Sequence, residues 1–246
     1  MIKPYDFPLL ITSAVRPVAN VKISNVSERL LQYKLATLRW AVETPFNKIV
    51  FIDNTDVKVF SDTEIFEFSN YGVELEQIVT KPNPEIEIRG TSFGISEIYE
   101  TAIQHSKLIN ESKHFAKVTG RLFVENMTDL INEIDENSSY LIRWLSKGIF
   151  RFKPGRFDER FGIYNKKFYI DYLLPLKSEM DDSKDRWIET VYNEVLEKEK
   201  LKLKSFKTYP RIVGISGHYG KPYDGNNFLV WKMKDLIDKY FKVLKY

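Results

Sequence analysis

The first part of the chain alternates short apolar runs with amphipathic stretches, and this alternation restricts the fold more than any other feature. An apolar run at 8–15 predicts a buried strand. Asn25 and Glu28 resemble a capping box, and the helix that they open ends before Pro45. One stripe of that helix is apolar and consists of Leu31, Leu35, Leu38 and Val42. A second apolar run at 48–56 completes a right-handed βαβ unit.

A glycine-punctuated turn then opens a second amphipathic helix. Gly90 and Gly94 free the backbone to approach a ligand or a neighbouring strand. The helix after them has one apolar face, made of Ile95, Ile98, Ala102 and Ile109. An apolar strand at 114–124 follows and contains Gly120 next to Arg121. The pattern outlines an anion site, and a plain turn with a helix cap is the alternative interpretation.

The alternation continues to about residue 145. The further elements that it predicts are a strand at 76–80, a short helix at 127–134 and a strand at 140–145. Alternating strands and helices predict a largely parallel sheet with helices on both faces. Ligands of such sheets bind beyond the carboxyl ends of the strands, which here fall at 12–16, 53–56 and 119–121.

The second part of the chain is richer in aromatic and charged residues. Aromatic side chains crowd 150–172 and are more typical of a core than of a ligand platform. An acidic loop at 181–185 leads into a helix at about 184–200. A lysine-rich segment follows at 198–207 and predicts a basic strand or a solvated edge. The last helix, 228–246, mixes apolar and basic residues; it can dock on the core, which is favoured, or lie on an anionic membrane.

Composition narrows the classes of function. The net charge of +3 over 246 residues does not indicate nucleic-acid binding by itself. The chain has no cysteine, which excludes disulfides, thiolate metal sites and cysteine nucleophiles. It also lacks an apolar secretion segment at its start and any run of the ~20 apolar residues that a membrane span needs. We therefore expect a cytoplasmic protein, with a peripheral contact at the inner face of the cell membrane as a further expectation.

At this point the motifs resemble a family. The order of a first strand, a helix, a second strand ending at Asp53, a glycine turn opening a helix and a third strand near 118 resembles GT-A-type nucleotide-sugar glycosyltransferases. More narrowly, three motifs are similar to small glycosyltransferase-like proteins of bacterial surface polysaccharide synthesis, the class that builds O-antigen and capsule. They are Gly90-x-x-x-Gly94-x-x-Glu97, Lys117-x-Thr119-Gly120-Arg121, and Phe157-Asp158-x-x-Phe161 leading to Trp187-Ile188-Glu189.

The resemblance covers about residues 8–220 and implies a single α/β domain over 1–246. Its fold would be GT-A-like and Rossmann-like, a mostly parallel sheet flanked by helices. Residues 1–145 would bind the nucleotide sugar, and 146–246 would shape the acceptor side as a helical and aromatic extension. The implied partners are a nucleotide-sugar donor and a saccharide or lipid-linked saccharide acceptor, without nucleic acid.

The chain departs from the family pattern at the metal site. GT-A enzymes usually carry Asp-x-Asp at the end of the strand after the glycine-turn helix, where this chain has Thr119-Gly120-Arg121. A guanidinium can neutralise a leaving diphosphate by bidentate contact. Our hypothesis is that Arg121, helped by Lys117 or Arg211, replaces the metal, so no metal or other cofactor is expected; manganese or magnesium remains the alternative. Arg121 as a structural ion-pair partner is an equal interpretation.

The resemblance assigns further residues to the donor side. Asp53 resembles the carboxylate that such enzymes use on the nucleotide base or ribose, and capping of a turn is its alternative role. Thr12 and Arg16 would border the same pocket. His218 lies in a glycine-rich loop after a strand and could contact the diphosphate.

The acceptor side requires a base. In inverting transfer a carboxylate must take the proton from the acceptor hydroxyl, because an alcohol is a poor nucleophile at neutral pH. Glu189 is the first candidate, since it follows the metal-site strand by about the interval at which these folds place a base. Glu97 and Asp158 are the alternatives, and Glu189 can equally be a solvated helix residue.

Two other classes of protein stay open. A nucleotidyltransferase also uses a parallel sheet and a glycine-rich turn, but typically places that turn directly after the first strand, where 12–17 has no glycine. A non-catalytic module could bind anionic lipid or nucleic acid through its basic segments. No Gly-x-Gly-x-x-Gly follows the first strand and no Gly-x-Ser-x-Gly is present, so a dinucleotide cofactor and a serine hydrolase are poorly supported.

Overall fold

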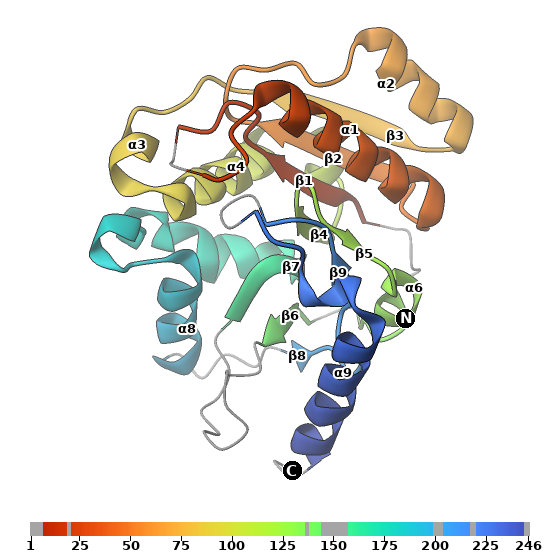
Figure 1. Cartoon of the computed structure of the whole chain (residues 1–246). Helices are drawn as coiled ribbons and strands as arrows, with labels where there is room; N and C mark the ends of the chain where they lie inside the picture. Colours follow the sequence, from red (N-terminus) through yellow and green to blue (C-terminus); the bar gives the residue numbers. More distant parts are fainter. Residues whose placement is uncertain are drawn as a thin grey trace.

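The protein is built around one mostly parallel sheet, shown in Figure 1. The computed structural model describes residues 7–18, 21–135, 138–143, 157–198, 204–216 and 220–243. Within these ranges the sheet has seven strands in the order β3-β2-β1-β4-β7-β6-β8. The strands are β1 Leu9–Ser13, β2 Lys48–Asp53, β3 Glu74–Val79, β4 His114–Thr119, β6 Tyr140–Arg143, β7 Phe157–Asn165 and β8 Lys204–Ser205. Strands β1 to β4 pair in parallel, whereas β7 runs antiparallel to both of its neighbours. The predicted α/β fold class is confirmed.

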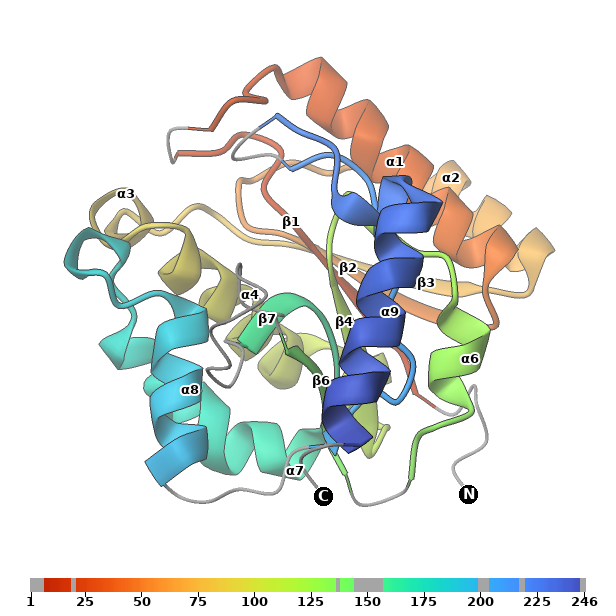
Figure 2. The same cartoon turned by 60° about the horizontal axis from the view of Figure 1, so that its bottom comes forward.

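Helices cover both faces of this sheet, as Figures 1 and 2 show. One face packs against α1 Val26–Glu43, α2 Asp62–Phe68 and α6 Met127–Ile131. The other face packs against α4 Thr91–His105, α5 Lys107–Asn110 and α8 Ile188–Lys198. The other α-helices of the described residues are α3 Glu85–Arg89, α7 Lys166–Phe168 and α9 Phe228–Val243. Alternate residues of the fully buried strand β1 enter the two cores, because successive side chains of a strand point to opposite faces.

The apolar stripe that predicts α1 does not face the core. Leu31 is 58% exposed, and the other stripe residues Leu35, Leu38 and Val42 are exposed as well. The buried face instead carries Tyr33 and Trp40, whose indole Nε1 donates to the carbonyl of Leu122 at 2.9 Å. Aromatic side chains bury more surface than leucine, so they outcompete the leucine stripe for the sheet. The pattern therefore identifies the helix but not its buried face.

Several element boundaries differ from the sequence prediction. The glycine-turn helix stops at Ser106, whose hydroxyl accepts from the Ile109 amide and starts the separate helix α5. The third strand is interrupted by a turn after Thr119, and its last part forms β5 Phe123–Val124, paired with β9 Ile212–Val213. Strand β7 was not predicted from the sequence; its residues appeared in an aromatic cluster and, through Phe157, Asp158 and Phe161, in one of the family-like motifs.

Gly120 occupies the turn after β4, where there is no room for a side chain. A Cβ there would lie 2.0 Å from the Thr12 carbonyl oxygen and 2.7 Å from Cε1 of Tyr33. We expect Gly120→Ala to lower the free energy of unfolding by about 1–3 kcal/mol or more, measured by urea denaturation. Gly72→Ala is the control, since Gly72 at φ 70° has open space around it and loses only the ~1 kcal/mol of a left-handed residue. An equal loss in both variants would contradict close packing at Gly120.

Candidate functional site

The candidate site lies at the carboxyl ends of β1, β2 and β4, where the sequence places it. Parallel pairing puts these three strand ends on one edge of the sheet. The amino end of β7 lies at the same edge, because β7 pairs antiparallel with β4. The residues before β7 fall outside the described ranges. This edge therefore collects Thr12, Asp53, Lys117 and the start of β7 from segments far apart in the sequence.

A buried ion pair joins β4 to β7 at this edge. Lys117 is 0% exposed, and its Nζ lies 3.4 Å from Oε1 of Glu159, which is 3% exposed. The same ammonium group donates to the Glu159 backbone carbonyl. Tyr99 donates to Glu159 Oε1, and Tyr164 donates to Oε2 at 3.0 Å. The Glu159 carboxylate is thus fully held within the chain, and Lys117 is compensated by it.

Glu189 lies in the first turn of α8, beside this pair. Its side chain is half-buried, and burial raises the pKa of Glu189 to about 7; the nearby carboxylates of Glu159 and Asp158 add to the rise, while Lys117 opposes it. No salt bridge to Glu189 is formed within the described part of the chain. A partly accessible carboxyl that titrates near neutral pH suits a group that accepts a proton.

The other two candidate bases are engaged by cations. Asp158 is 1% exposed and accepts from Nε of Arg160 with both oxygens, at 2.8 and 3.0 Å. Glu97 lies on α4, where it accepts from Asn83 at 2.5 Å and lies 3.3 Å from Nζ of Lys177. Of the three predicted carboxylates, Asp158 is the one that the structure brings close to Glu189.

Asp53 is fully buried at the end of β2. Its carboxylate accepts from the Ser13 hydroxyl at 2.8 Å and the Val15 amide at 2.9 Å. Thr55 donates to it twice, through the amide at 2.8 Å and the hydroxyl at 2.6 Å. Asp53 therefore holds together the loops that follow β1 and β2, and its contact with a nucleotide stays a prediction. Thr12, in β1, is also buried.

The backbone after the glycine turn does bind an anion, and this anion is a carboxylate side chain of the protein itself. The Ser92 amide, at the start of α4, donates to Oδ2 of Asp182 at 3.2 Å. A Cβ on Gly90 would lie 2.5 Å from that oxygen, so glycine permits this approach. Gly94 is buried, and its carbonyl accepts from the Asn54 side chain at 3.2 Å. Asp182 thus fills the place at the N-terminus of α4 where the sequence outlines an anion site.

Two guanidinium groups, those of Arg29 and Arg121, each lie 5.7 Å from the Tyr33 ring, close to the ends of β1 and β4. Arg121 is half-buried and donates to Gln32 Oε1 at 2.7 Å. Burial is the main cause that lowers the pKa of Arg121 below its ordinary value. Arg29 is 5% exposed and donates to the carbonyl of Ala14. In the described residues neither guanidinium has a carboxylate partner. Among the described residues, the positive charge of this corner is therefore not compensated by a carboxylate.

The other predicted cations lie differently. The side chain of Arg16 is exposed, and its amide donates to the Thr55 hydroxyl at 3.1 Å. Arg211 lies 2.6 Å from Glu125 Oε2 and also donates to a backbone carbonyl. The prediction for His218 falls outside the described residues.

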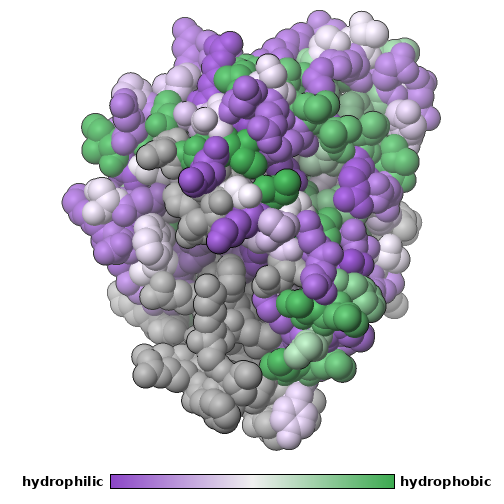
Figure 3. Space-filling model, viewed as in Figure 1, coloured by the Kyte–Doolittle hydropathy of each residue, from purple (hydrophilic) through white to green (hydrophobic). Residues whose placement is uncertain are grey.

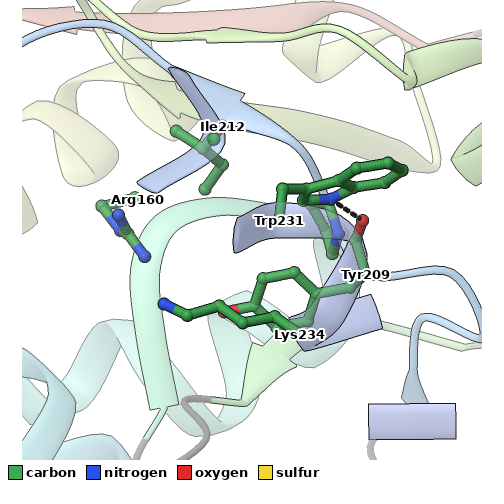
Figure 4. Close-up of a pocket in the computed structure, with 7 residues that line it drawn as sticks. Arg160, Tyr209, Ile212, Trp231 and Lys234 are labelled. Atoms are coloured by element: carbon green, nitrogen blue, oxygen red, sulfur yellow. Dashed lines mark hydrogen bonds between the residues drawn. The ribbon is translucent and has the colours of Figure 1, made fainter. Parts of the chain in front are cut away.

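A small hollow opens between β7, β9 and α9. Figure 4 shows Arg160 and Lys234 reaching toward it, with Tyr209 and Trp231 on its wall. The Trp231 indole donates to the Tyr209 carbonyl at 3.0 Å. Arg160 connects this hollow to the site, because the same guanidinium pairs with Asp158.

The residues described here do not offer a metal-binding set. Among them no three His, Asp or Glu side chains gather closely enough to hold an ion, and Asp158 and Glu159 are already held by cations. Whether the protein needs a metal stays a prediction. Within the same ranges, no helix has both the length and the apolarity needed to cross a bilayer.

The sequence analysis missed four residues that shape the site: Arg29, Tyr99, Glu159 and Asp182. Glu159 directly follows the predicted Asp158. Because no strand was predicted there, nothing in the sequence indicated that the Glu159 side chain points into the core. Asp182 was visible only as part of an acidic loop. Arg29 follows the capping box on the side of the helix opposite the leucine stripe, which the leucine pattern predicts to face solvent.

No family model matches the sequence, and no curated protein matches it. Among solved structures, the glycosyltransferase GlyE of Streptococcus pneumoniae TIGR4 is similar with a TM-score of 0.50 and 13% identity, over 82% of this chain and 45% of that one. This chain thus spans less than half of the GlyE chain.

Two further structures match less well. The galactosyltransferase LgtC gives a TM-score of 0.47 and 11% identity, over 76% of this chain and 69% of that one. The 4-diphosphocytidyl-2C-methyl-D-erythritol synthase of Anaerococcus prevotii DSM 20548 gives a TM-score of 0.41 and 13% identity, over 82% of this chain and 86% of that one. Similarity at this level of identity concerns the fold alone. The similarity to GlyE, together with the mostly parallel sheet, shows that the chain has a GT-A-like α/β fold.

Proposed function

We propose that this protein transfers a sugar from a nucleotide-diphosphate sugar to a saccharide acceptor. The observation that carries the proposal is Glu189, a half-buried carboxyl with a pKa raised to about 7 by burial, at the carboxyl edge of a GT-A-like sheet. The acceptor would be a saccharide built on a lipid carrier for the cell surface, and the reaction would take place in the cytoplasm at the inner face of the membrane.

In this proposal Glu189 acts as the base of an inverting transfer. Its carboxylate takes the proton of the acceptor hydroxyl while that oxygen forms a bond to the anomeric carbon. The bond from the anomeric carbon to the diphosphate oxygen breaks, and the nucleoside diphosphate leaves with the electron pair. The buried pair of Lys117 and Glu159 fixes the wall beside Glu189 and does not exchange protons in this scheme.

Arg121 is proposed to take up the charge of the leaving diphosphate. Its guanidinium lacks a carboxylate partner in the described residues and lies with Arg29 near the strand ends, which is where a phosphate would compensate both. Charge-assisted bonds from guanidinium to phosphate are strong and geometrically specific. Lys117 and Arg211 are already paired with carboxylates, so Arg121 would act without the helpers first suggested.

A thermal-shift panel tests the proposal. UDP, GDP, CDP, CMP and their common sugars are each added with EDTA and with manganese, since a ligand that binds the folded state raises the melting temperature. The proposal expects stabilisation by one nucleotide class in EDTA. Stabilisation only with manganese would contradict the role of Arg121 but keep the enzyme class. No response to any nucleotide would contradict the proposed function and favour a non-catalytic module.

Replacing Arg121 gives a more specific prediction. We expect Arg121→Met to weaken binding of the nucleoside diphosphate by roughly tenfold or more, because a charge-assisted bond contributes about 1.5–3 kcal/mol. Affinity is measured by isothermal titration in EDTA. Arg39→Met is the matched control, since Arg39 lies on α1 and pairs with Glu43 at the surface. Unchanged affinity in the Arg121 variant would assign the phosphates to another part of the site.

A further inference from the structure

Helices α4 and α8 both begin without a capping side chain of their own. The residue before α4 is Gly90, which has no side chain to offer. The residue before α8 is Trp187, whose carbonyl accepts from the Val191 amide at 2.9 Å and so starts the helical bonding. An indole can donate a hydrogen bond but cannot accept one. Trp187 therefore cannot satisfy the first amides of the helix that it starts.

Each of these helices takes the missing acceptor from the segment that starts the other. The Ser92 amide, second in α4, donates to Oδ2 of Asp182 at 3.2 Å, and Asp182 lies in the loop that leads into α8. The Ile188 amide, first in α8, donates to Oγ of Ser92 at 3.1 Å. Ser92 and Ile188 are 6% and 2% exposed, so the bond between them is shielded from water. The two helix starts thus cap each other, and Ser92 takes part in both bonds.

The loop before α8 gains little from apolar burial. Its residues from 181 to 186 are mostly charged, and Figure 3 shows mainly hydrophilic residues over this part of the molecule. Asp181 and Arg186 close the loop on itself through two backbone bonds of 3.0 Å. The bonds of Asp182 and Ile188 to Ser92 then tie the loop and the start of α8 to α4.

Glu189 directly follows Ile188, so the Ser92 bond fixes the helical turn that carries the candidate base. The Glu189 carboxyl also interacts with its own backbone amide, which favours the charged form and opposes the effect of burial on its pKa. The titratable groups that interact with Glu189 come from β4, β7 and α8 itself, and they are Lys117, Asp158, Glu159 and Tyr192. The effect of all these groups depends on where the first turn of α8 lies.

We propose that Ser92 is a positioning residue for Glu189, and that its hydroxyl holds the start of α8 where the Glu189 carboxylate can reach the acceptor hydroxyl. This inference rests on the proposed role of Glu189 as the base. Ser92 touches no substrate in this scheme and acts through the Ile188 amide. The glycine turn thereby gains a role outside donor binding, because Gly90 leaves the room in which Asp182 reaches the Ser92 amide.

Ser92→Ala in the whole protein tests this role. Without the hydroxyl the Ile188 amide has no acceptor and the first turn of α8 frays, so kcat of sugar transfer should fall roughly tenfold to hundredfold. Glu189 also becomes more solvated. Because burial is the largest cause of its raised pKa, the midpoint of the pH–rate profile should move from about 7 toward 4.5. The affinity for the nucleotide should stay unchanged.

Two further variants accompany Ser92→Ala. Asp182→Ala removes the other cap and should lower kcat and the midpoint in the same direction, from a residue that is only half-buried. Ser96→Ala is the matched control, since Ser96 is 1% exposed on the same helix and donates to the Phe93 carbonyl within that helix. It should keep the wild-type kcat and midpoint. Melting curves check that each variant is folded.

Three kinetic results would overturn the proposal. The first is a folded Ser92→Ala protein with the wild-type kcat and midpoint. The second is an equal loss of kcat in the Ser96 control. The third is a loss of nucleotide affinity as large as the loss of kcat, which would place Ser92 in donor binding.

A measurement without any sugar donor separates this inference from the proposed function. The urea midpoints of wild type and E189Q are compared at about pH 4 and about pH 8, with and without Ser92→Ala. The gap that opens at the higher pH should shrink by about half or more when Ser92 is replaced, because Glu189 is then less buried. An undiminished gap would overturn the positioning role even if sugar transfer is found. A reduced gap without turnover of any donor would support the Ser92 contact and contradict the proposed function.

Discussion

Replacing Glu189 with glutamine is expected to lower kcat of sugar transfer about 10²–10⁴-fold, the usual contribution of a general base. The amide keeps the shape of the side chain but cannot accept the proton. Glu194→Gln is the matched control on the same helix, because Glu194 is exposed and pairs with Arg186 at 2.6 Å. Nucleotide affinity should stay the same in both variants. If E189Q keeps the wild-type rate, the base is a different group.

The pH dependence follows from the same carboxyl. Burial raises the pKa of Glu189 to about 7, and only the ionised form accepts a proton, so the rate should rise with pH through about 7 and level off above it. Because its pKa is raised, the Glu189 carboxyl binds its proton more tightly in the folded protein than in the unfolded chain, and this stabilises the fold. The stabilisation is fully present below the ordinary pKa of 4.5 and is lost as the pH rises through about 7.

E189Q should therefore be more stable than the wild type at about pH 8, by ~1–3 kcal/mol, because it has no buried charge to form. The difference should vanish near pH 4. Urea denaturation at both pH values measures it. A glutamine variant that is less stable than the wild type at about pH 8 would show that the carboxylate is favourably bound in the folded protein.

Replacing Lys117 with methionine should destabilise the fold more than any surface change. The Glu159 carboxylate, 3% exposed, would lose its buried cation, and breaking such a pair costs about 3–5 kcal/mol. Urea denaturation at neutral pH measures the loss. Lys58→Met is the matched control, since Lys58 and Asp62 form an exposed pair that contributes at most about 1 kcal/mol.

A second substitution makes this prediction specific. Glu159→Gln in the Lys117→Met background removes the charge that was left alone and should restore much of the lost stability. If the double variant is as unstable as the two single losses added together, the two residues do not act as a pair. Tyr99 and Tyr164 donate to different oxygens of Glu159, so in the glutamine variant one of them still donates to the remaining oxygen and the hydroxyl of the other must accept from the amide nitrogen.

Strands β1 and β2 could be predicted because they are mostly apolar on both faces and bounded by turn residues. Strand β7 could not, because its alternating aromatic and charged residues are equally typical of a core cluster. Helix α1 shows a different limit: the leucine stripe gives the period of the helix, but the larger Tyr33 and Trp40 decide which face is buried. Which of the two faces is buried depends on how the side chains pack against the sheet, and this cannot be read from the sequence.

The site shows the same division. Glu189 was predicted as the candidate base, and its position in a half-buried first helical turn supports that hypothesis. The pair of Lys117 and Glu159 could not be foreseen, since its residues lie 42 positions apart and meet through the antiparallel β4 and β7 pairing. The Asp182 cap of α4 was hidden for a similar reason, because it comes from a loop 90 positions away from Ser92.

The central claim, sugar transfer with Glu189 as the base, can be tested by product release with water taking the place of the acceptor hydroxyl. Sugar conjugates of UDP, GDP and CDP and CMP-linked sugars are each incubated with the wild type or E189Q in EDTA, and the free nucleotide is quantified by chromatography. The account predicts that the wild type releases nucleotide from one donor class and that E189Q releases it far more slowly. Release from no donor, or equal release by both proteins, would contradict it.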